Sequence, residues 1–578
     1  MRSTLSIALT GSGGAGVVTA GRVLLDAATR AGWYGLLRRS SGPQIRGGES
    51  AALLRLGAHP VDCLDDHFDV LVALDWGNIE RFADEIPLVA TSLVLSDPSA
   101  GAVPAAIAAK GAQHVALPLR ELATAAERAP ENMVAAGALC AALGVDAEHV
   151  EACIEALLGR KGGDALTAAV RGARAGAAGV PAACADLALP AMATRPAHRW
   201  ALSGNEAAGL GALRGGVRFV AAYPITPASE LLEWLAPRLT GLGGALVQAE
   251  DELASINMCL GASYGGVPSL TATSGPGLAL MTEGLGLAVA GEIPVVVVDV
   301  MRGGPSTGIP TKSEQTDLDI ALNGLHGDAP HLVLAPVSVA DCAFTTQWAV
   351  HLAETLQAPA IVLSDQALGQ TRVVTERPAD VAFLTRRRVA SPDQAEYRRY
   401  AAGGDGIAAM AVPGTPGTTY TAEGLEHDER GTPSSSSGHH ARQLARRTDK
   451  LDRHDYGPWA TLVEGDGDTA IVTWGSTCGA VREAAARERA RGRAVRVVAP
   501  RLLAPARHGE VDGASALERA LDGVERVLVV EQSHSRQFHR YLRAWHDLPR
   551  QVRCLARPGP LPIAPEEVRA ALGDWSQR

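Results

Sequence analysis

Unbroken runs of apolar residues are the feature of this chain that most limits its fold. Five such runs, each five residues long, lie between residues 218 and 364: Arg218–Ala222, Gly244–Gln248, Ser269–Thr273, Val295–Asp299 and Ala360–Ser364. Continuous apolar strands are typical of parallel sheets, because helices cover both faces and neither face needs polar residues. The central part of the chain is therefore predicted to be a doubly wound α/β domain.

Similar patterns occur on both sides of this region. Strands are expected at Leu5–Leu9, Val70–Leu74, Ser92–Ser96, Thr469–Trp474, Val495–Val498 and Arg526–Glu531. We therefore expect a multidomain α/β protein with domains at residues 1–180, 200–385 and 455–578. The Ala/Pro-rich residues 181–199 are predicted to be a linker. The Gly/Pro/Ser/Thr-rich residues 386–454 are predicted to be an extended connecting segment across the surface.

Composition excludes several classes of function. The net charge of −10 at pH 7 argues against a nucleic-acid partner. No apolar run approaches ~20 residues and no signal sequence follows Met1, so we expect a cytoplasmic protein that does not enter a membrane. The eight cysteines are scattered and none forms a Cys-x-x-Cys pair. This predicts reduced thiols and no iron–sulfur cluster on this chain.

Residues 223–277 predict half of a thiamine diphosphate site. Glu250-Asp-Glu252 precedes a helix pattern of small residues at 253–263, and a Ser274-Gly275 turn follows the next strand. Thiamine chemistry requires a buried carboxylate at the start of such a helix. The carboxylate holds the aminopyrimidine ring in the imino form that activates the cofactor.

The other half of a thiamine site is missing from the sequence. A Gly-Asp-Gly loop that holds magnesium diphosphate needs an Asn about one βα unit downstream as a further oxygen ligand. The triplets Gly404–Gly406 and Gly465–Gly467 occur, but no Asn follows Asn323. The diphosphate and its Mg²⁺ are therefore expected on another polypeptide, and no metal site is predicted here.

Several separated motifs together resemble a known family, the 2-oxoacid:ferredoxin oxidoreductases. Those that resemble its α subunit, and most closely the 2-oxoglutarate type, are Tyr223–Pro227, Glu250–Glu252, Arg302–Gly308, Val412–Pro416, Gly424–Asp428 and Trp474–Ser476. Gly11–Val17 and Ser41–Gly48 resemble the γ subunit of the same family. The chain is thus similar to a fused γ–α form over nearly its whole length.

The resemblance implies a γ-type domain, a pyrimidine-type thiamine domain and a transketolase C-terminal-like domain. It also implies oxidative decarboxylation of a 2-oxo acid with coenzyme A to acyl-CoA and CO2. The electrons would pass to ferredoxin through a [4Fe-4S] cluster on a separate β subunit, in an expected dimer of αβ units. Glu252 is favoured over Glu250 as the cofactor carboxylate, because it stands nine residues before Gly261 as in the family.

Two side chains at predicted strand ends are candidates to hold the substrate. Thr226, between two prolines, follows the strand at 218–222, and its hydroxyl is expected to contact the 2-oxo acid. Arg302 follows the run at 295–300, and a guanidinium there suits a bidentate pair with a carboxylate. The structural alternatives are a tight turn for Thr226 and a surface position for Arg302.

The first glycine turn predicts a phosphate site. Gly11, Gly13 and Gly16 lie between a strand and a helix, but no Asp or Glu occurs at 33–39, where an NAD-binding fingerprint would have one. A phosphate cradled at a helix N-terminus fits this pattern better. The family resemblance makes coenzyme A the candidate ligand, with Arg46 as a phosphate partner.

Lys312 is the candidate for substrate specificity. The chain has only four lysines among 53 lysine and arginine residues, so a lysine just after the Arg302–Thr311 segment is unusual for this protein. An ammonium group suits the distal carboxylate of 2-oxoglutarate. Pairing with Glu314 or Asp317 is an equal alternative.

Three other functions stay open at this point. A thiamine-dependent decarboxylase or transketolase-like enzyme would use the same half-site without a redox step. The same oxidative chemistry on aryl or branched-chain 2-oxo acids is a second alternative. A regulatory subunit that binds a nucleotide at Gly11–Gly16 is the third.

Overall fold

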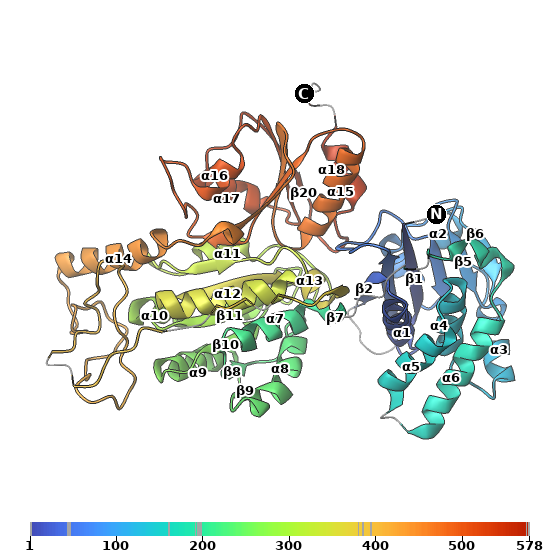
Figure 1. Ribbon diagram of the computed structural model, residues 1–578, viewed down its shortest axis with the longest axis horizontal. Helices are drawn as coiled ribbons and strands as arrows, with labels where there is room; N and C mark the ends of the chain where they lie inside the picture. The colour runs from blue at the N-terminus through green and yellow to red at the C-terminus, as the bar shows by residue number, and fades with distance from the viewer. Residues whose placement is uncertain are drawn as a thin grey trace. The chain divides into compact units, whose positions relative to one another are not determined.

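The computed structural model of the chain describes residues 3–42, 48–159, 162–190, 192, 199–379, 381–383, 387–393, 396–573 and 575. The chain forms two compact units (Figure 1). The first consists of Met1–Ser203, Gln370–Pro378 and Ala564–Glu566, and the second of Gly204–Gly369, Ala379–Ile563 and Glu567–Arg578.

The first unit is built on an eight-stranded mixed sheet with the order β6-β5-β4-β1-β3-β2-β14-β7. The strands are β1 (Thr4–Ser12), β2 (Tyr34–Ser41), β3 (Glu49–Gly57), β4 (Val70–Ala73), β5 (Leu93–Ser96), β6 (Gln113–Ala116), β7 (Arg199–Ser203) and β14 (Arg372–Glu376). Strands β1, β4, β5 and β6 are parallel, whereas β3 is antiparallel to both β1 and β2. The sequence had placed β14 in the central domain, but it pairs antiparallel with β2 and β7.

Helices of the first unit pack apolar side chains against one face of this sheet. The helices packed there are α1 (Val17–Arg30), α3 (Leu119–Ala125), α4 (Glu131–Ala142), α5 (Ala147–Leu158) and α6 (Gly163–Ala178). Helix α2 (Ala105–Ala108) packs in a separate cluster. Figure 1 shows α1, α4, α5 and α6 gathered together. Alanines and leucines on the buried sides of α1 and α4 fill this core, and Phe68, Phe82 and Ile107 belong to a second cluster.

The second unit contains a seven-stranded sheet with the order β18-β12-β13-β11-β10-β8-β9. Its strands are β8 (Phe219–Ala222), β9 (Ala245–Gln248), β10 (Ser269–Thr273), β11 (Val295–Met301), β12 (Leu332–Leu334), β13 (Pro359–Asp365) and β18 (Leu502–Ala504). All neighbours from β9 to β12 are parallel, and β18 is antiparallel to β12. Strands β10, β11 and β13 are buried at every residue, as continuous apolar runs predict.

Helices cover this sheet on both faces (Figure 1). They are α7 (Gly204–Arg214), α8 (Ser229–Gly241), α9 (Glu252–Tyr264), α10 (Gly275–Gly291), α11 (Leu318–Asn323), α12 (Asp341–Leu356) and α13 (Gln366–Gln370). Helix α10 is apolar around nearly its whole circumference and packs in the core beside α9 and β11.

A five-stranded sheet with the order β15-β17-β16-β19-β20 completes the second unit. Its elements are β15 (Thr461–Glu464), β16 (Thr469–Thr473), β17 (Arg496–Pro500), β19 (Arg526–Glu531), β20 (Gln551–Ala556), α15 (Cys478–Ala490), α16 (Ala516–Ala520), α17 (Gln537–Trp545) and α18 (Pro565–Ala571). Gln315 joins this sheet to the seven-stranded one. Its side chain donates to the carbonyl of Trp474 at 2.8 Å and accepts from the backbone of Gln532 at 2.7 Å.

The connecting segment differs from the extended surface chain that its composition predicts. Its last part is a 16-residue helix, α14 (Ser437–Asp452). Arg399, His427 and Lys450 are almost completely buried, so the segment is packed into the second unit. Charged side chains that bond to the core hold it there, and a composition rich in small polar residues gives no sign of such bonds.

Candidate functional site

The predicted thiamine-side residues converge on one edge of the seven-stranded sheet. Strands β9, β8, β10 and β11 are adjacent and parallel, so their carboxyl ends lie together. Glu252 follows β9, Thr226 follows β8, Ser274 and Gly275 follow β10, and Arg302 follows β11. The carboxyl edge is where open α/β sheets bind ligands.

Glu252 is the first residue of helix α9, and its side chain is buried with 7% of its surface exposed. The preceding Asp251 is the N-cap: its side chain accepts a hydrogen bond from the amide of Ala254 at 2.7 Å. Asp251 therefore satisfies the N-terminal end of α9, and the Glu252 carboxylate is not needed for that role. Glu250 is exposed. Among the described residues none donates a hydrogen bond to the Glu252 carboxylate, which leaves it available to a ligand.

Helix α10 begins against Glu252. A Cβ atom at Gly277 would lie 2.8 Å from Oε1 of Glu252 and 2.0 Å from Oγ1 of Thr273, so a larger residue cannot replace this glycine without a shift. Ser274, the N-cap of α10, is completely buried, and its Oγ has no hydrogen-bond partner in the described structure. A buried hydroxyl without a partner is costly, which points to a ligand or water at this position.

The side chain of Arg302 contacts the backbone of Thr226. Nη1 of Arg302 donates to the carbonyl oxygen of Thr226 at 2.7 Å. The guanidinium is buried, and its Nε has no acceptor among the described residues. Burial lowers the pKa of Arg302, and Asp317 partly offsets this effect. Thr226 itself is exposed and precedes a cis peptide bond to Pro227.

The loop after Arg302 folds back on itself. The amide of Gly303 donates to the carbonyl of Lys312 at 3.0 Å, and the amide of Ile309 donates to the carbonyl of Gly303 at 2.8 Å. These bonds bring Lys312 to the base of the loop near Arg302. Glu314, an alternative partner for Lys312, is buried and accepts from the amide of Gly559 at 2.8 Å.

Two aspartates that the sequence analysis did not assign to the thiamine site lie at the start of α10. Asp299, in β11, is completely buried and pairs in register with Thr273, the last residue of β10. Both carboxylate oxygens of Asp317 lie 2.6 Å from the position of a Cβ on Gly275. Burial and then the charge of Asp317 hold the pKa of Asp299 well above its usual range, and burial raises the pKa of Asp317 to about 6. An Asp inside the run Val295–Met301 was the sequence signal for this pair.

The opposite end of α10 carries a second charged cluster. Glu292, at the C-cap, is buried and bonds to Arg446 and to Lys450, whose Nζ lies 2.8 Å from its Oε2. Lys450 also donates to the carbonyl of Gln357 at 2.9 Å, and Arg399 donates to the carbonyl of Glu292 at 3.0 Å. After the cost of burial, these cations hold the pKa of Glu292 far below its usual range.

The glycine turn of the first unit joins β1 to α1, with Gly11 still inside the strand. Gly16 is the N-cap of α1 with φ of 81°, and a Cβ there would lie 2.3 Å from Nδ2 of Asn132, so both its backbone and its surroundings require glycine. The amide of Gly13 donates to the carbonyl of Gly48 at 2.6 Å. Arg46 lies outside the described residues.

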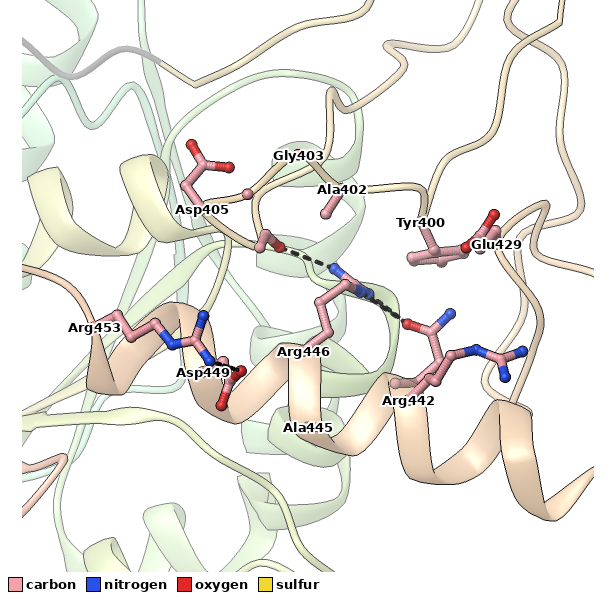
Figure 2. Close-up of a pocket in the computed structure, with 13 residues that line it drawn as sticks. Tyr400, Ala402, Gly403, Asp405, Glu429, Arg442, Ala445, Arg446, Asp449 and Arg453 are labelled. Carbon is pink, nitrogen blue, oxygen red and sulfur yellow. Dashed lines mark hydrogen bonds and ion pairs between the residues drawn. The ribbon is translucent and has the colours of Figure 1, made fainter.

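A surface pocket of about 360 Å³ lies elsewhere in the second unit. Figure 2 shows it between α14, which contributes Arg442, Arg446 and Arg453, and the loop around Gly403 and Asp405. Arg446 is bonded to Gln443 and to the carbonyl of Gly406, and Arg453 pairs with Asp449. None of the residues predicted for thiamine or substrate lines this pocket.

Comparisons with family models match two segments of the chain. Residues 210–447 match the family described as pyruvate flavodoxin/ferredoxin oxidoreductase, thiamine diP-bdg, and residues 6–179 match pyruvate ferredoxin/flavodoxin oxidoreductase. The 2-oxoglutarate synthase subunit KorA of Methanothermobacter thermautotrophicus is 36% identical over 64% of this chain and 96% of that protein. The chain belongs to the 2-oxoacid:ferredoxin oxidoreductase family.

Two further matches from this family extend the likeness. The 2-oxoglutarate oxidoreductase subunit KorA of Mycobacterium tuberculosis is 37% identical over 66% of this chain and 60% of that protein. A solved 2-oxoglutarate:ferredoxin oxidoreductase from Magnetococcus marinus, with 2-oxoglutarate, coenzyme A and succinyl-CoA bound, covers 99% of both chains at 35% identity and a TM-score of 0.88. The expected α/β fold class and the expected family are confirmed, and the chain is an oxidoreductase subunit.

Other features of this oxidoreductase subunit concern its cysteines and helices. Seven of the eight cysteines are buried and Cys554 is partly buried; burial raises the pKa of the Cys259 thiol to about 12, as for a small apolar core residue. No group of three or more His, Cys, Asp or Glu side chains gathers as metal ligands in the part of the chain that is described. No described helix combines the length and apolar character needed to span a bilayer.

Proposed function

We propose that this chain is the fused γ–α subunit of a coenzyme-A-acylating 2-oxoglutarate:ferredoxin oxidoreductase. The observation that carries the proposal is the full-length likeness to the Magnetococcus marinus enzyme, whose structure contains 2-oxoglutarate, coenzyme A and succinyl-CoA. The convergence of Glu252, Thr226, Ser274 and Arg302 on one sheet edge supports it.

The residues at this edge fit thiamine diphosphate. Glu252 is buried at the start of α9 with no donor among the described residues, and Ser274 has a buried hydroxyl without a partner. Glu252 would accept a proton from the aminopyrimidine ring, and Ser274 and Gly275 would contact the cofactor at the N-terminus of α10. When bound, thiamine diphosphate supplies the carbon nucleophile that permits decarboxylation.

Arg302 would bind the 2-oxo acid. It is a buried cation whose Nε has no acceptor among the described residues, and a carboxylate is the acceptor that best matches a guanidinium. Its bond to the Thr226 carbonyl holds the guanidinium against the backbone of Thr226. The Thr226 hydroxyl would contact the keto oxygen. Lys312, at the base of the same loop, would meet the distal carboxylate of 2-oxoglutarate.

The remaining parts of the reaction belong to partners. We place the Mg²⁺-diphosphate loop and the [4Fe-4S] cluster on a β subunit, because no Asn follows Asn323 and the cysteines are scattered. Ferredoxin would accept the electrons, and the assembly would be a cytoplasmic dimer of αβ units. Coenzyme A would bind at Gly11, Gly13 and Gly16, with Arg46 as a phosphate partner.

Co-expression with the β subunit tests this function. The purified complex should reduce a viologen dye with 2-oxoglutarate only when coenzyme A is present, and Arg46→Ala should raise the KM for coenzyme A alone. Purified without its partner, the chain should lack iron–sulfur absorbance and bind thiamine diphosphate weakly. Decarboxylation without an electron acceptor would favour a non-redox enzyme, and turnover restricted to aryl or branched-chain 2-oxo acids would reassign the substrate.

A further inference from the structure

Asp299 is completely buried, Asp317 is partly buried, and the two carboxyl groups lie next to each other. Within the described residues, neither oxygen of Asp299 nor Oδ2 of Asp317 has a conventional hydrogen-bond donor. The two carboxyl groups are instead within bonding reach of each other, which is possible when one of them carries a proton. Two ionised carboxylates in contact inside a protein would repel strongly, so the pair holds one proton in its resting state.

The structure holds Asp317 firmly in this position. From α17, the side chain of Gln537 donates to the carbonyl of Thr316 at 2.9 Å and accepts from the amide of Asp319 at 2.9 Å. The residues on both sides of Asp317 are thus tied to the same helix. On its other side the carboxylate touches the first residue of α10, where the positive end of the helix dipole favours a negative charge.

The charged side chains near Asp299 and Asp317 determine how the protonation of this pair can change. Arg302 at the end of β11 is attracted to Asp317, and Glu314 on the preceding loop repels it. Asp319, on α11, is paired with Arg540 of α17. The N-terminus of α10 and Arg302 already supply positive charge here, so the pair does not resemble a vacant cation site. One net negative charge on the pair balances the single charge of Arg302.

We propose that Asp299 and Asp317 form a proton-sharing carboxyl pair whose charge follows the occupancy of Arg302, so that a carboxylate ligand binds at Arg302 together with one proton. The inference rests on the proposed function, because it takes Arg302 as the substrate's cation. When the ligand carboxylate pairs with Arg302, the negative charge of Asp317 loses its counter-charge. Asp317 then takes a proton from solvent and returns it when the ligand leaves. Asp317 acts through Arg302 and is a positioning residue.

Calorimetry with a non-reactive dicarboxylate tests the proposal. Glutarate is titrated at pH 7 into the purified complex without thiamine diphosphate, in two buffers that differ in their heat of ionisation. The difference in measured heat gives the number of protons taken up. The wild-type complex should take up roughly half a proton or more per bound glutarate, since Asp317 with a pKa of about 6 is mostly ionised before binding. Asp319→Asn, a change on the same helix, should leave this uptake unchanged.

The variants of the pair should behave differently from each other. Asp317→Asn removes the group that takes the proton, so glutarate should still bind but proton uptake should fall close to zero. Asp299→Asn replaces a protonated acid by a neutral amide, so uptake should persist. Glutarate binding without proton uptake in the wild type, or uptake retained in Asp317→Asn, would overturn the inference and leave the proposed function intact. Absent binding, or binding unchanged by Arg302→Gln, would overturn both.

Discussion

Helix α10 carries a cluster of charged side chains at each end, and the two clusters differ in whether their carboxylates are paired with cations. At the C-terminal end, the C-end cluster of Glu292, Arg399, Arg446 and Lys450 satisfies the last carbonyls and the Glu292 carboxylate. At the N-terminal end, the N-end cluster of Glu252, Ser274, Asp299 and Asp317 contains buried polar atoms without partners in the described structure. The carboxylate at the C-terminal end of the helix is thus paired with cations, whereas the carboxylates at the N-terminal end have no such partners among the described residues.

The comparison distinguishes charged groups that stabilise the fold from charged groups that are available to a ligand. Natural proteins satisfy buried polar groups almost completely, so unsatisfied ones cluster where a ligand, water or proton is expected. The C-end cluster holds α14 against α10 and α12, because Lys450 bonds to the C-caps of both helices. Cations at helix C-termini are favourable there. Both oxygens of the Glu292 carboxylate are paired, whereas Nε and Nη1 of the buried Arg399 have no hydrogen-bond partner among the described residues.

The largest effect should come from the C-end cluster. Lys450→Met leaves the Glu292 carboxylate buried with one cation fewer, and breaking a buried ion pair in this way typically costs about 3–5 kcal/mol. We expect a loss of this size in the free energy of unfolding, measured by chemical denaturation. Arg453→Met, on the exposed side of the same helix, should cost less than about 1 kcal/mol. A loss below 1 kcal/mol for Lys450→Met would show that the cluster does not hold the segment.

The contacts of the C-end cluster could not be predicted from the sequence. The apolar runs predict strands β8 to β11 and β13, because a strand buried on both faces consists of consecutive apolar residues. The bonds from Arg446 and Lys450 to Glu292 join residues more than 150 positions apart, and no local pattern records them. For the same reason, Lys450 stands out in the sequence as one of only four lysines, but its partner Glu292 cannot be predicted.

At the N-end cluster, the sequence located the ligand edge but not all of its chemistry. Glu252 was found because it precedes a helix pattern of small residues and has the family's spacing to Gly261. Arg302 was found because it follows a predicted strand, and strand ends converge by topology alone. Asp317 was considered only as a partner for Lys312, since its contact with Gly275 and Asp299 depends on how the loop after Arg302 folds. Asp251 was overlooked as the cap that frees Glu252 from that role.

The N-end cluster should lose activity with little loss of stability. Glu252→Gln keeps the shape but removes the carboxylate, so turnover of the complex should fall by at least ~10²-fold, as for loss of a positioned acid–base group. Its unfolding free energy should change little, since no described residue bonds to this carboxylate. The exposed Glu250→Gln is the matched control and should retain most activity. A reversed ranking of the two variants would transfer the cofactor role to Glu250.

Lys312 tests whether the loop at this edge selects the substrate. Lys312→Met should raise the KM for 2-oxoglutarate through loss of a charge-assisted bond worth roughly 1.5–3 kcal/mol. Turnover of a 2-oxo acid without a distal charge should change little. Steady-state kinetics on both substrates measure the difference. Equal losses on both would assign Lys312 to the structure of the loop and reopen the choice of substrate.

The smallest effect should be a difference in how pH acts on the two ends. The pKa of Asp317 is raised to about 6, so the folded state binds more protons than the unfolded state between about pH 4 and 6, and this group's contribution to stability falls as pH rises through that range. The lowered pKa of Glu292 has the opposite sign: its contribution is present above about pH 4.5 and is lost as pH falls. Asp317→Asn removes this group. The unfolding free energy at pH 7 minus that at pH 4 should therefore be larger in Asp317→Asn than in wild type, by on the order of 1–2 kcal/mol.

Glu292→Gln should lower the free energy of unfolding at pH 7 much more than at pH 3. Denaturation curves of both variants across pH 3–7 measure these slopes, and parallel slopes in the two variants would contradict the assignment of opposite roles to the two ends of α10.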